Sequence, residues 1–160
     1  MRFRSITLAV TALTTLAAAP GLAADHAAAL QVRDPWVRWL PGNLPAGGYL
    51  TLVNDGDQSV SLVAASCPDY GAVSLHRSVN LGNTSHMAAV DHIAVAAHSS
   101  LEFAALGYHL MLEQPNHPLK PGDHVAITLR FAGAPPQTVS FQLRAPGASD
   151  SMPAMPGMTQ

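Results

Sequence analysis

The chain has 160 residues, of which 48% are hydrophobic, 11% charged and 6% aromatic. This length suits one domain with an apolar core, since most domains run to roughly 100–150 residues. Eight basic residues against ten acidic ones leave no cationic surface for nucleic acid or anionic lipid. A single cysteine excludes an intrachain disulfide framework, a zinc site built from several cysteines and an iron–sulfur cluster.

Residues 1–24 have the features of a secretory signal peptide. A short basic start is followed by an uncharged apolar run over 6–19, then by Pro20-Gly21 and small residues. A membrane anchor needs about 20 uninterrupted apolar residues, and Pro20-Gly21 interrupts this run. Cleavage after Ala23 and after Ala24 both fit, and we prefer Ala24. We therefore expect a periplasmic protein with no stable membrane insertion after cleavage.

The segment 25–144 is predicted to be one all-β domain. In 124–131 every odd position is large and apolar, and the same alternation runs through 138–143. This period of two is typical of half-buried antiparallel strands. Many short strands separated by turn residues predict a β-sandwich or β-barrel. Similar runs lie near 29–33, 36–40, 48–53, 59–65, 72–77, 91–96, 99–104 and 108–112.

The composition changes over 145–160. This segment is rich in proline, glycine and methionine and contains no β-branched hydrophobic residue. It cannot bury enough apolar surface to offset the entropy lost on ordering. We therefore expect a flexible, Met-rich C-terminal tail.

The methionines suggest a soft metal ion. Thioethers favour Cu(I), whereas imidazole binds copper in either oxidation state. The tail holds three of the five methionines beyond the initiator, and the other two stand beside histidines: Met152, Met155 and Met158, then Met87 after His86 and Met111 near His109. This placement points to copper.

Strand alternation brings several of these groups to one side. In the run 108–112, His109 and Met111 point to one face and their apolar neighbours to the other. By the same alternation, His76 faces away from the apolar side of its own run. Met87 lies in a polar stretch that can fold over the pair. One face of the sheet is thus predicted to carry nitrogen and sulfur ligands.

The spacing of these four residues resembles that of a known family. The order His76, ten residues, Met87, twenty-one residues, His109-x-Met111 is similar to the signature of the periplasmic PCu(A)C copper chaperones. The resemblance covers roughly residues 30–144. Further similar segments are 34–38, 48–52, 107–112 and 118–123.

The resemblance implies a cupredoxin-like antiparallel β-sandwich that binds one Cu(I). Its ligands would be His76, Met87, His109 and Met111. The family implies delivery of copper to cytochrome c oxidase assembly, with a Sco-type thiol protein or an oxidase subunit as acceptor.

Two positions depart from the family's common pattern. Many members have an acidic residue directly after the first histidine, where this chain has Arg77. Many also have a second methionine two residues before the ligand methionine, where this chain has Ser85. Neither change removes a ligand, but each could alter affinity or docking.

Secondary metal ligands are a separate hypothesis. His86 is either a spare ligand or a solvated loop histidine. His26 is a candidate for Cu(II) near the mature N-terminus, and the tail methionines Met152, Met155 and Met158 can wrap round a soft ion. Surface positions are expected for His92, His98, His117 and His124, and a structural or incidental thiol for Cys67, whose spacing does not suit a blue-copper centre.

The sequence therefore favours an exported, monomeric Cu(I) carrier. No order of nucleophile and base and no paired carboxylates argue for an enzyme. The first alternative is a periplasmic copper-buffering or resistance protein without a dedicated acceptor. The second is a redox cupredoxin.

Overall fold

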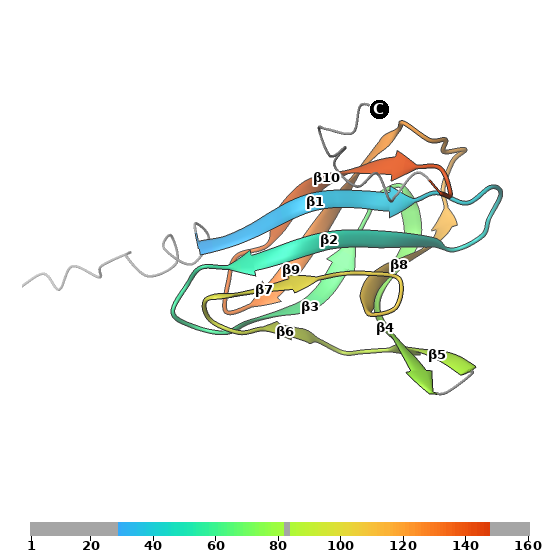
Figure 1. Cartoon of the computed structure of the whole chain (residues 1–160). Helices are drawn as coiled ribbons and strands as arrows, with labels where there is room; N and C mark the ends of the chain where they lie inside the picture. Colours follow the sequence, from blue (N-terminus) through green and yellow to red (C-terminus); the bar gives the residue numbers. More distant parts are fainter. Residues whose placement is uncertain (1–28, 82–83, 148–160) are drawn as a thin grey trace, which may run out of the picture.

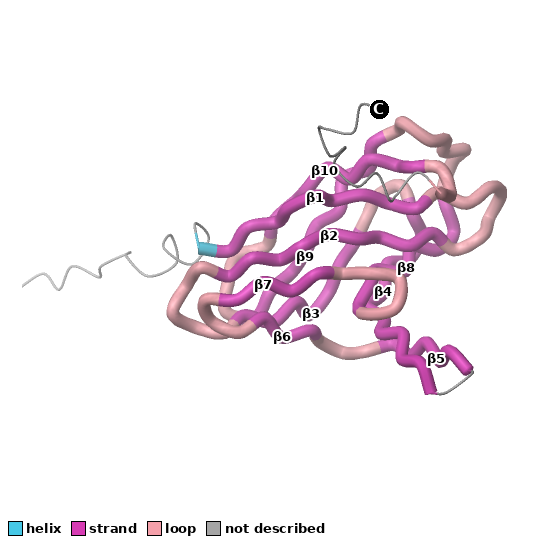
Figure 2. The backbone as a smooth tube through the Cα atoms, in the orientation of Figure 1, coloured by secondary structure: helices cyan, strands magenta, loops and turns pink. Residues whose placement is uncertain are grey.

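The computed structural model describes residues 29–81 and 84–147, in which strands and their connecting loops make up nearly all of the chain (Figures 1 and 2). The leader, His26 and the tail methionines lie outside these residues. No helix in the described ranges is long and apolar enough to cross a membrane. The strands are β1 (Leu30–Arg38), β2 (Ala46–Asn54), β3 (Val60–Ser66), β4 (Tyr70–Leu81), β5 (Thr84–Ala89), β6 (Ile93–Val95), β7 (Ser99–Glu102), β8 (Tyr108–Pro115), β9 (His124–Ala132) and β10 (Gln137–Arg144).

The strands pair in the order β5-β4-β8-β2-β1-β10-β9-β3-β6, and β7 pairs with β2. All pairs are antiparallel except β1 with β10, which is parallel. The path folds back on itself, so that the layer of β1 and β2 lies in front of β3 and β9 in Figure 1. The prediction of a cupredoxin-like antiparallel β-sandwich is confirmed.

The core lies where the alternating runs placed it. Val125, Ile127 and Leu129 of β9 are buried, while their neighbours face outward. Phe141 and Leu143 of β10 are buried in the same way. Each such side chain removed from water contributes roughly 1.5–3 kcal/mol. The apolar alternation therefore determines which face of each strand packs into the core and which face can carry functional side chains.

The sequence prediction was wrong about the first strand. Two runs were expected, near 29–33 and 36–40, but β1 is one strand with a register shift between Arg33 and Trp36. Asp34, within the shift, has φ 49°. A bulge of this kind inserts an extra residue and reverses the side-chain alternation. As a result Val37 points into the core, and its neighbours on β1 point outward.

The prediction also missed β5. The polar stretch that contains Met87 is a strand that pairs with β4, and β4 runs on to residue 81 rather than ending near 77. In Figure 1 this hairpin projects from the lower right of the sandwich. The hairpin therefore carries Met87 on a paired strand instead of a loop.

Candidate metal centre

The pairing of β4 with β8 brings three of the expected ligands together. His76 lies opposite His109, and Ser74 lies opposite Met111. Residues directly opposite in an antiparallel pair project from the same face. Both histidines and Met111 therefore share one face, with the two imidazole centroids 5.9 Å apart.

Met87 reaches the same face from β5. It lies opposite Ser78, two residues beyond His76 on β4. Its side chain lines a cavity of about 120 Å³ together with His109 and Met111. Met87 is 53% exposed and His109 only 4%. The cavity is thus lined by one buried imidazole and by one exposed methionine side chain.

The surroundings of His109 favour the neutral imidazole with one ring nitrogen free to bind a metal ion. Its Nδ1 lies 3.2 Å from the carbonyl oxygen of Gly107, so Nδ1–H can donate there and leave the Nε2 lone pair free. Burial lowers the pKa of His109, against the raising effect of the Gly107 hydrogen bond. The charges of His76 and Arg38 lower this pKa further. A neutral imidazole at neutral pH is the form that binds metal.

One ring nitrogen of His76 has a hydrogen-bond partner among the described residues, and the other has none. Its Nε2 lies 3.0 Å from the Ser74 hydroxyl oxygen. Its Nδ1 is buried and has no hydrogen-bond partner in the described part of the chain. Buried polar atoms are nearly always paired, because an unpaired one costs roughly 1–3 kcal/mol. In the tautomer that donates from Nε2, the Nδ1 lone pair suits a metal ion.

This donor set fits Cu(I). It combines two neutral imidazoles with two thioethers, which are soft ligands. Over the described ranges, no three His, Cys, Asp or Glu side chains come together as a metal site. The set is uncharged, which matches a singly charged ion better than a doubly charged one.

The cavity wall includes groups that the sequence reasoning did not select. Arg38 and Tyr49 line it beside His109. Gly47 lies opposite Met111, and a Cβ at Gly47 would stand 2.6 Å from the Tyr49 hydroxyl oxygen. The only sequence signal for these residues was their place in or next to the segments similar to the family.

His86 does not belong to this group. It pairs with Val79 of β4, one position away from Met87, so strand alternation turns it to the opposite face, where it is exposed. The expectation of surface positions is confirmed for the remaining histidines in the described part, which are all exposed: His92, His98, His117 and His124.

Cys67 is buried, and its Sγ lies 3.7 Å from Oδ2 of Asp69. Burial raises the pKa of the Cys67 thiol. A protonated, buried thiol is a poor nucleophile and a poor metal ligand. This agrees with a structural thiol.

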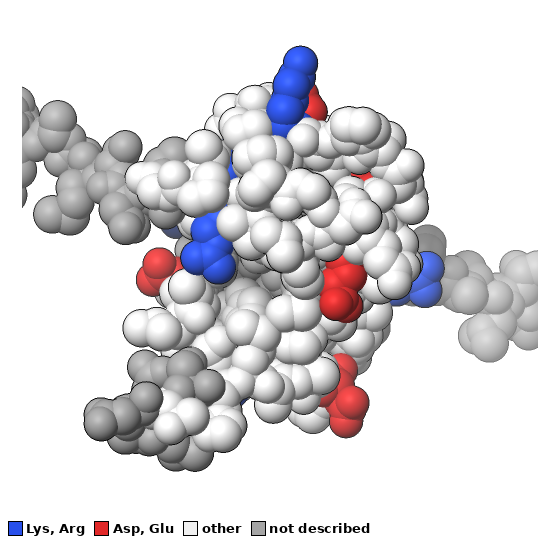
Figure 3. Space-filling view, turned by 90° about the vertical axis from the view of Figure 1, so that its right-hand side faces the viewer, with Lys and Arg blue, Asp and Glu red and all other residues white. Residues whose placement is uncertain are grey.

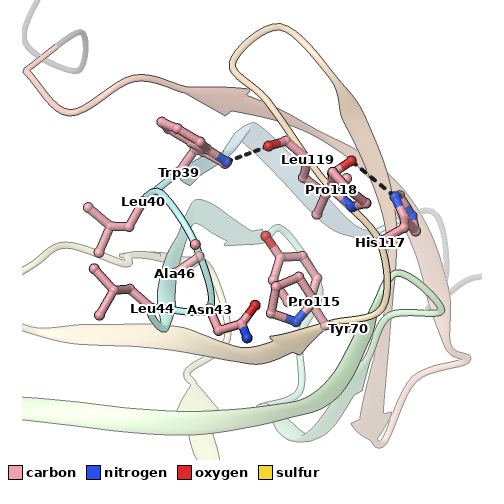
Figure 4. Close-up of a pocket in the computed structure, with 11 residues that line it drawn as sticks. Trp39, Leu40, Asn43, Leu44, Ala46, Tyr70, Pro115, His117, Pro118 and Leu119 are labelled. Atoms are coloured by element: carbon pink, nitrogen blue, oxygen red, sulfur yellow. Dashed lines mark hydrogen bonds between the residues drawn. The ribbon is translucent and has the colours of Figure 1, made fainter.

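A second, larger cavity of about 330 Å³ is lined in part by the β1–β2 loop (Figure 4). Trp39 lines it and donates from Nε1 to the Leu119 carbonyl oxygen at 2.8 Å. Tyr70 also lines it, and burial raises the pKa of Tyr70 to about 12. This cavity contains no thioether and one exposed imidazole, so the smaller cavity is the candidate metal centre despite its size.

Two solved structures with a similar fold are copper-loaded. The copper-bound PCuAC domain from PmoF2 superimposes with a TM-score of 0.63 at 25% identity, covering 74% of this chain and 94% of that domain. The Cu(I) form of DR1885 from Deinococcus radiodurans superimposes with a TM-score of 0.62 at 27% identity, covering 78% of this chain and 85% of that one. The molecule is thus a cupredoxin-like β-sandwich of the PCuAC class, and the resemblance noted from the sequence is confirmed.

Residues 30–143 match the model of the LpqE-like lipoprotein family, and the chain belongs to this family. A similar protein is Lxx21020 of Leifsonia xyli subsp. xyli, which is described as a lipoprotein. It is 27% identical over 133 residues, which cover 82% of this chain and 78% of that protein.

Proposed function

We propose that the protein binds one Cu(I) through His76, Met87, His109 and Met111 and delivers it to another protein outside the cytoplasm. The observation that carries this proposal is the single cavity shared by Met87, His109 and Met111, with the unpartnered His76 Nδ1 on the same face. The copper-bound state of the similar PCuAC domain from PmoF2 supports it.

Delivery follows from the chemistry of the donors. Copper stays Cu(I) throughout, while bonds to imidazole and thioether are replaced by bonds to thiolate, a stronger soft donor. The exposed Met87 thioether is the first ligand that an incoming thiolate can replace. We propose a Sco-type thiol protein or an oxidase subunit as acceptor, in cytochrome c oxidase assembly.

We propose a periplasmic, monomeric and non-enzymatic protein. The lipoprotein family to which the chain belongs supports export. We propose that the domain works free of the membrane after leader cleavage.

The first test is an anaerobic Cu(I) titration of the mature protein against a competing chromophoric chelator. We expect one tight equivalent, which the Met87→Ala, Met111→Ala double variant loses. The matched control is the Met152→Ala, Met155→Ala, Met158→Ala variant, which keeps that equivalent. An unchanged titration in the double variant would refute the site.

Transfer separates a chaperone from the alternative, a copper-buffering or resistance protein. The Cu(I)-loaded protein is mixed with an equal concentration of a dithiol peptide, and copper is followed into the peptide. Transfer supports a carrier. Retention of copper by the protein would favour buffering.

A further inference from the structure

Arg38 lines the cavity that contains Met87, His109 and Met111, called the metal cavity below, and Arg144 lies beside Arg38. Arg38 on β1 and Arg144 on β10 are register partners in the parallel pair, so they project from the same face. Neither forms an ion pair in the described part of the chain, whose ion pairs both involve histidine. Like charges at adjacent strand positions are destabilising. The pair therefore destabilises the isolated domain, even though the chain as a whole carries a net charge of −2.

Aromatic rings hold both guanidinium groups in place. Arg38 lies over the ring of Tyr49 at 5.8 Å, and Arg144 lies over the ring of Trp36 at 5.3 Å. The two rings pack against each other with centroids 4.6 Å apart. Each guanidinium thus uses a face for a cation–π contact, which leaves its N–H edge available. The edge is the part that binds a carboxylate in a bidentate manner.

The Nε of Arg38 is buried and has no hydrogen-bond partner among the described residues, so an incoming carboxylate has to meet this guanidinium at its Nη groups. Arg38 also lines the metal cavity together with His109 and Met111. A carboxylate bound to Arg38 would therefore lie at the wall of this cavity, close to the exposed Met87 thioether.

The charge distribution at this end of the molecule favours binding of a single acidic group over binding of a polyanion. The end of the sandwich shown in Figure 3 presents mostly uncharged side chains, with cationic and anionic groups at scattered points. A broad cationic field that would attract any polyanion is absent from that view. A pair of oriented guanidinium groups instead suits one carboxylate, or two adjacent ones, in a fixed position.

We propose that Arg38 and Arg144 form a carboxylate clamp that docks an acidic side chain of the copper acceptor beside the metal cavity. This inference rests on the proposed function. The partner it fits is a protein whose copper-binding thiols are flanked by Asp or Glu. In the docked complex the thiolates replace the protein's ligands on Cu(I), and the proton of each incoming thiol passes to solvent. The nearby positive charge of Arg38 favours that deprotonation.

The test compares two acceptor peptides with the same two-cysteine core, one flanked by three Glu and the other by three Lys. The full mature protein is loaded with Cu(I), and transfer is followed by stopped flow at low salt. We expect transfer to the Glu peptide to be about tenfold faster, as for electrostatically steered association. In Arg144→Gln this preference falls at least threefold, while Cu(I) affinity in the chelator titration is unchanged.

The matched control is Arg130→Gln, because Arg130 is an exposed arginine on β9 in the opposite layer. It keeps the wild-type preference. Equal rates for the two peptides, or a preference that Arg144→Gln leaves intact, would overturn the clamp while copper transfer itself still stands. No transfer to either peptide would instead overturn the proposed function.

Discussion

The contact between Gly47 and Tyr49 makes a sharp prediction about the wall of the metal cavity. A Cβ at position 47 would stand 2.6 Å from the Tyr49 hydroxyl oxygen and 3.0 Å from Cζ. Both distances are far below an ordinary carbon contact of about 3.5–4.0 Å. Tyr49 is buried and packs against Trp36, so its ring cannot turn away freely. We expect Gly47→Ala to strain this part of the sheet.

The size of the effect follows from that geometry. Overpacking a well-packed site typically costs about 1–3 kcal/mol. For a domain of this size, 2 kcal/mol corresponds to a fall in Tm of roughly 8 °C. Because Gly47 lies opposite Met111, displacement of the Tyr49 ring also disturbs the cavity, and Cu(I) affinity should fall together with stability.

A double-mutant cycle isolates the contact. Tyr49→Phe removes the nearest atom, so Gly47→Ala should cost less in that background than in the wild type. Gly107→Ala is the control, since a Cβ there would have only the Ala104 carbonyl oxygen within reach, at 3.8 Å. Tm is measured by circular dichroism and affinity by chelator competition. An unchanged Tm in Gly47→Ala, or the same loss in both backgrounds, would refute the reasoning.

Two further predictions concern His117 and residues 148–160. His117 lies 2.9 Å from a carboxylate oxygen of Asp69, and this hydrogen bond raises the pKa of His117. The pair therefore stabilises the fold below the unfolded-state pKa of about 6.5, and the benefit is lost as pH rises through the folded pKa. In urea unfolding, His117→Ala should destabilise more at pH 5.5 than at pH 8.5; equal losses would contradict this. Deletion of residues 148–160 should lower copper stoichiometry by removing Met152, Met155 and Met158, and the four-ligand site should keep its affinity; unchanged stoichiometry by metal analysis would show that the tail binds no copper.

The apolar alternation made most of the fold predictable. Runs such as 124–131 predict both the strand and its buried face, because one side of a strand in a sandwich must be apolar. The same logic placed His109 and Met111 together on β8. The β1 bulge was not predictable in this way, since it depends on a pairing register that β1 shares with β2. That bulge is what turns Trp36 outward.

The strand β5 was missed for a related reason. Its sequence has few large apolar residues, because exposed positions dominate it. The hairpin pairing with β4 gives it its structure instead of burial in the core. The sequence did not predict the arginine clamp either. Arg38 and Arg144 are about a hundred residues apart in the chain, and only the pairing of β1 with β10 brings them together.

The unequal burial of the candidate ligands bears on whether the site stores copper or passes it on. His109 lies on β8, which is paired on both sides, by β4 and β2. Met87 lies on β5, the last strand in the pairing order, and is more than half exposed. Edge elements open at lower free energy than central ones. Under the proposed function, the Met87 thioether would therefore be the ligand that an approaching thiolate displaces first, while His109 would still hold the ion. Such unequal burial favours a carrier over a storage protein, because ligand exchange needs one ligand that leaves more easily than the others.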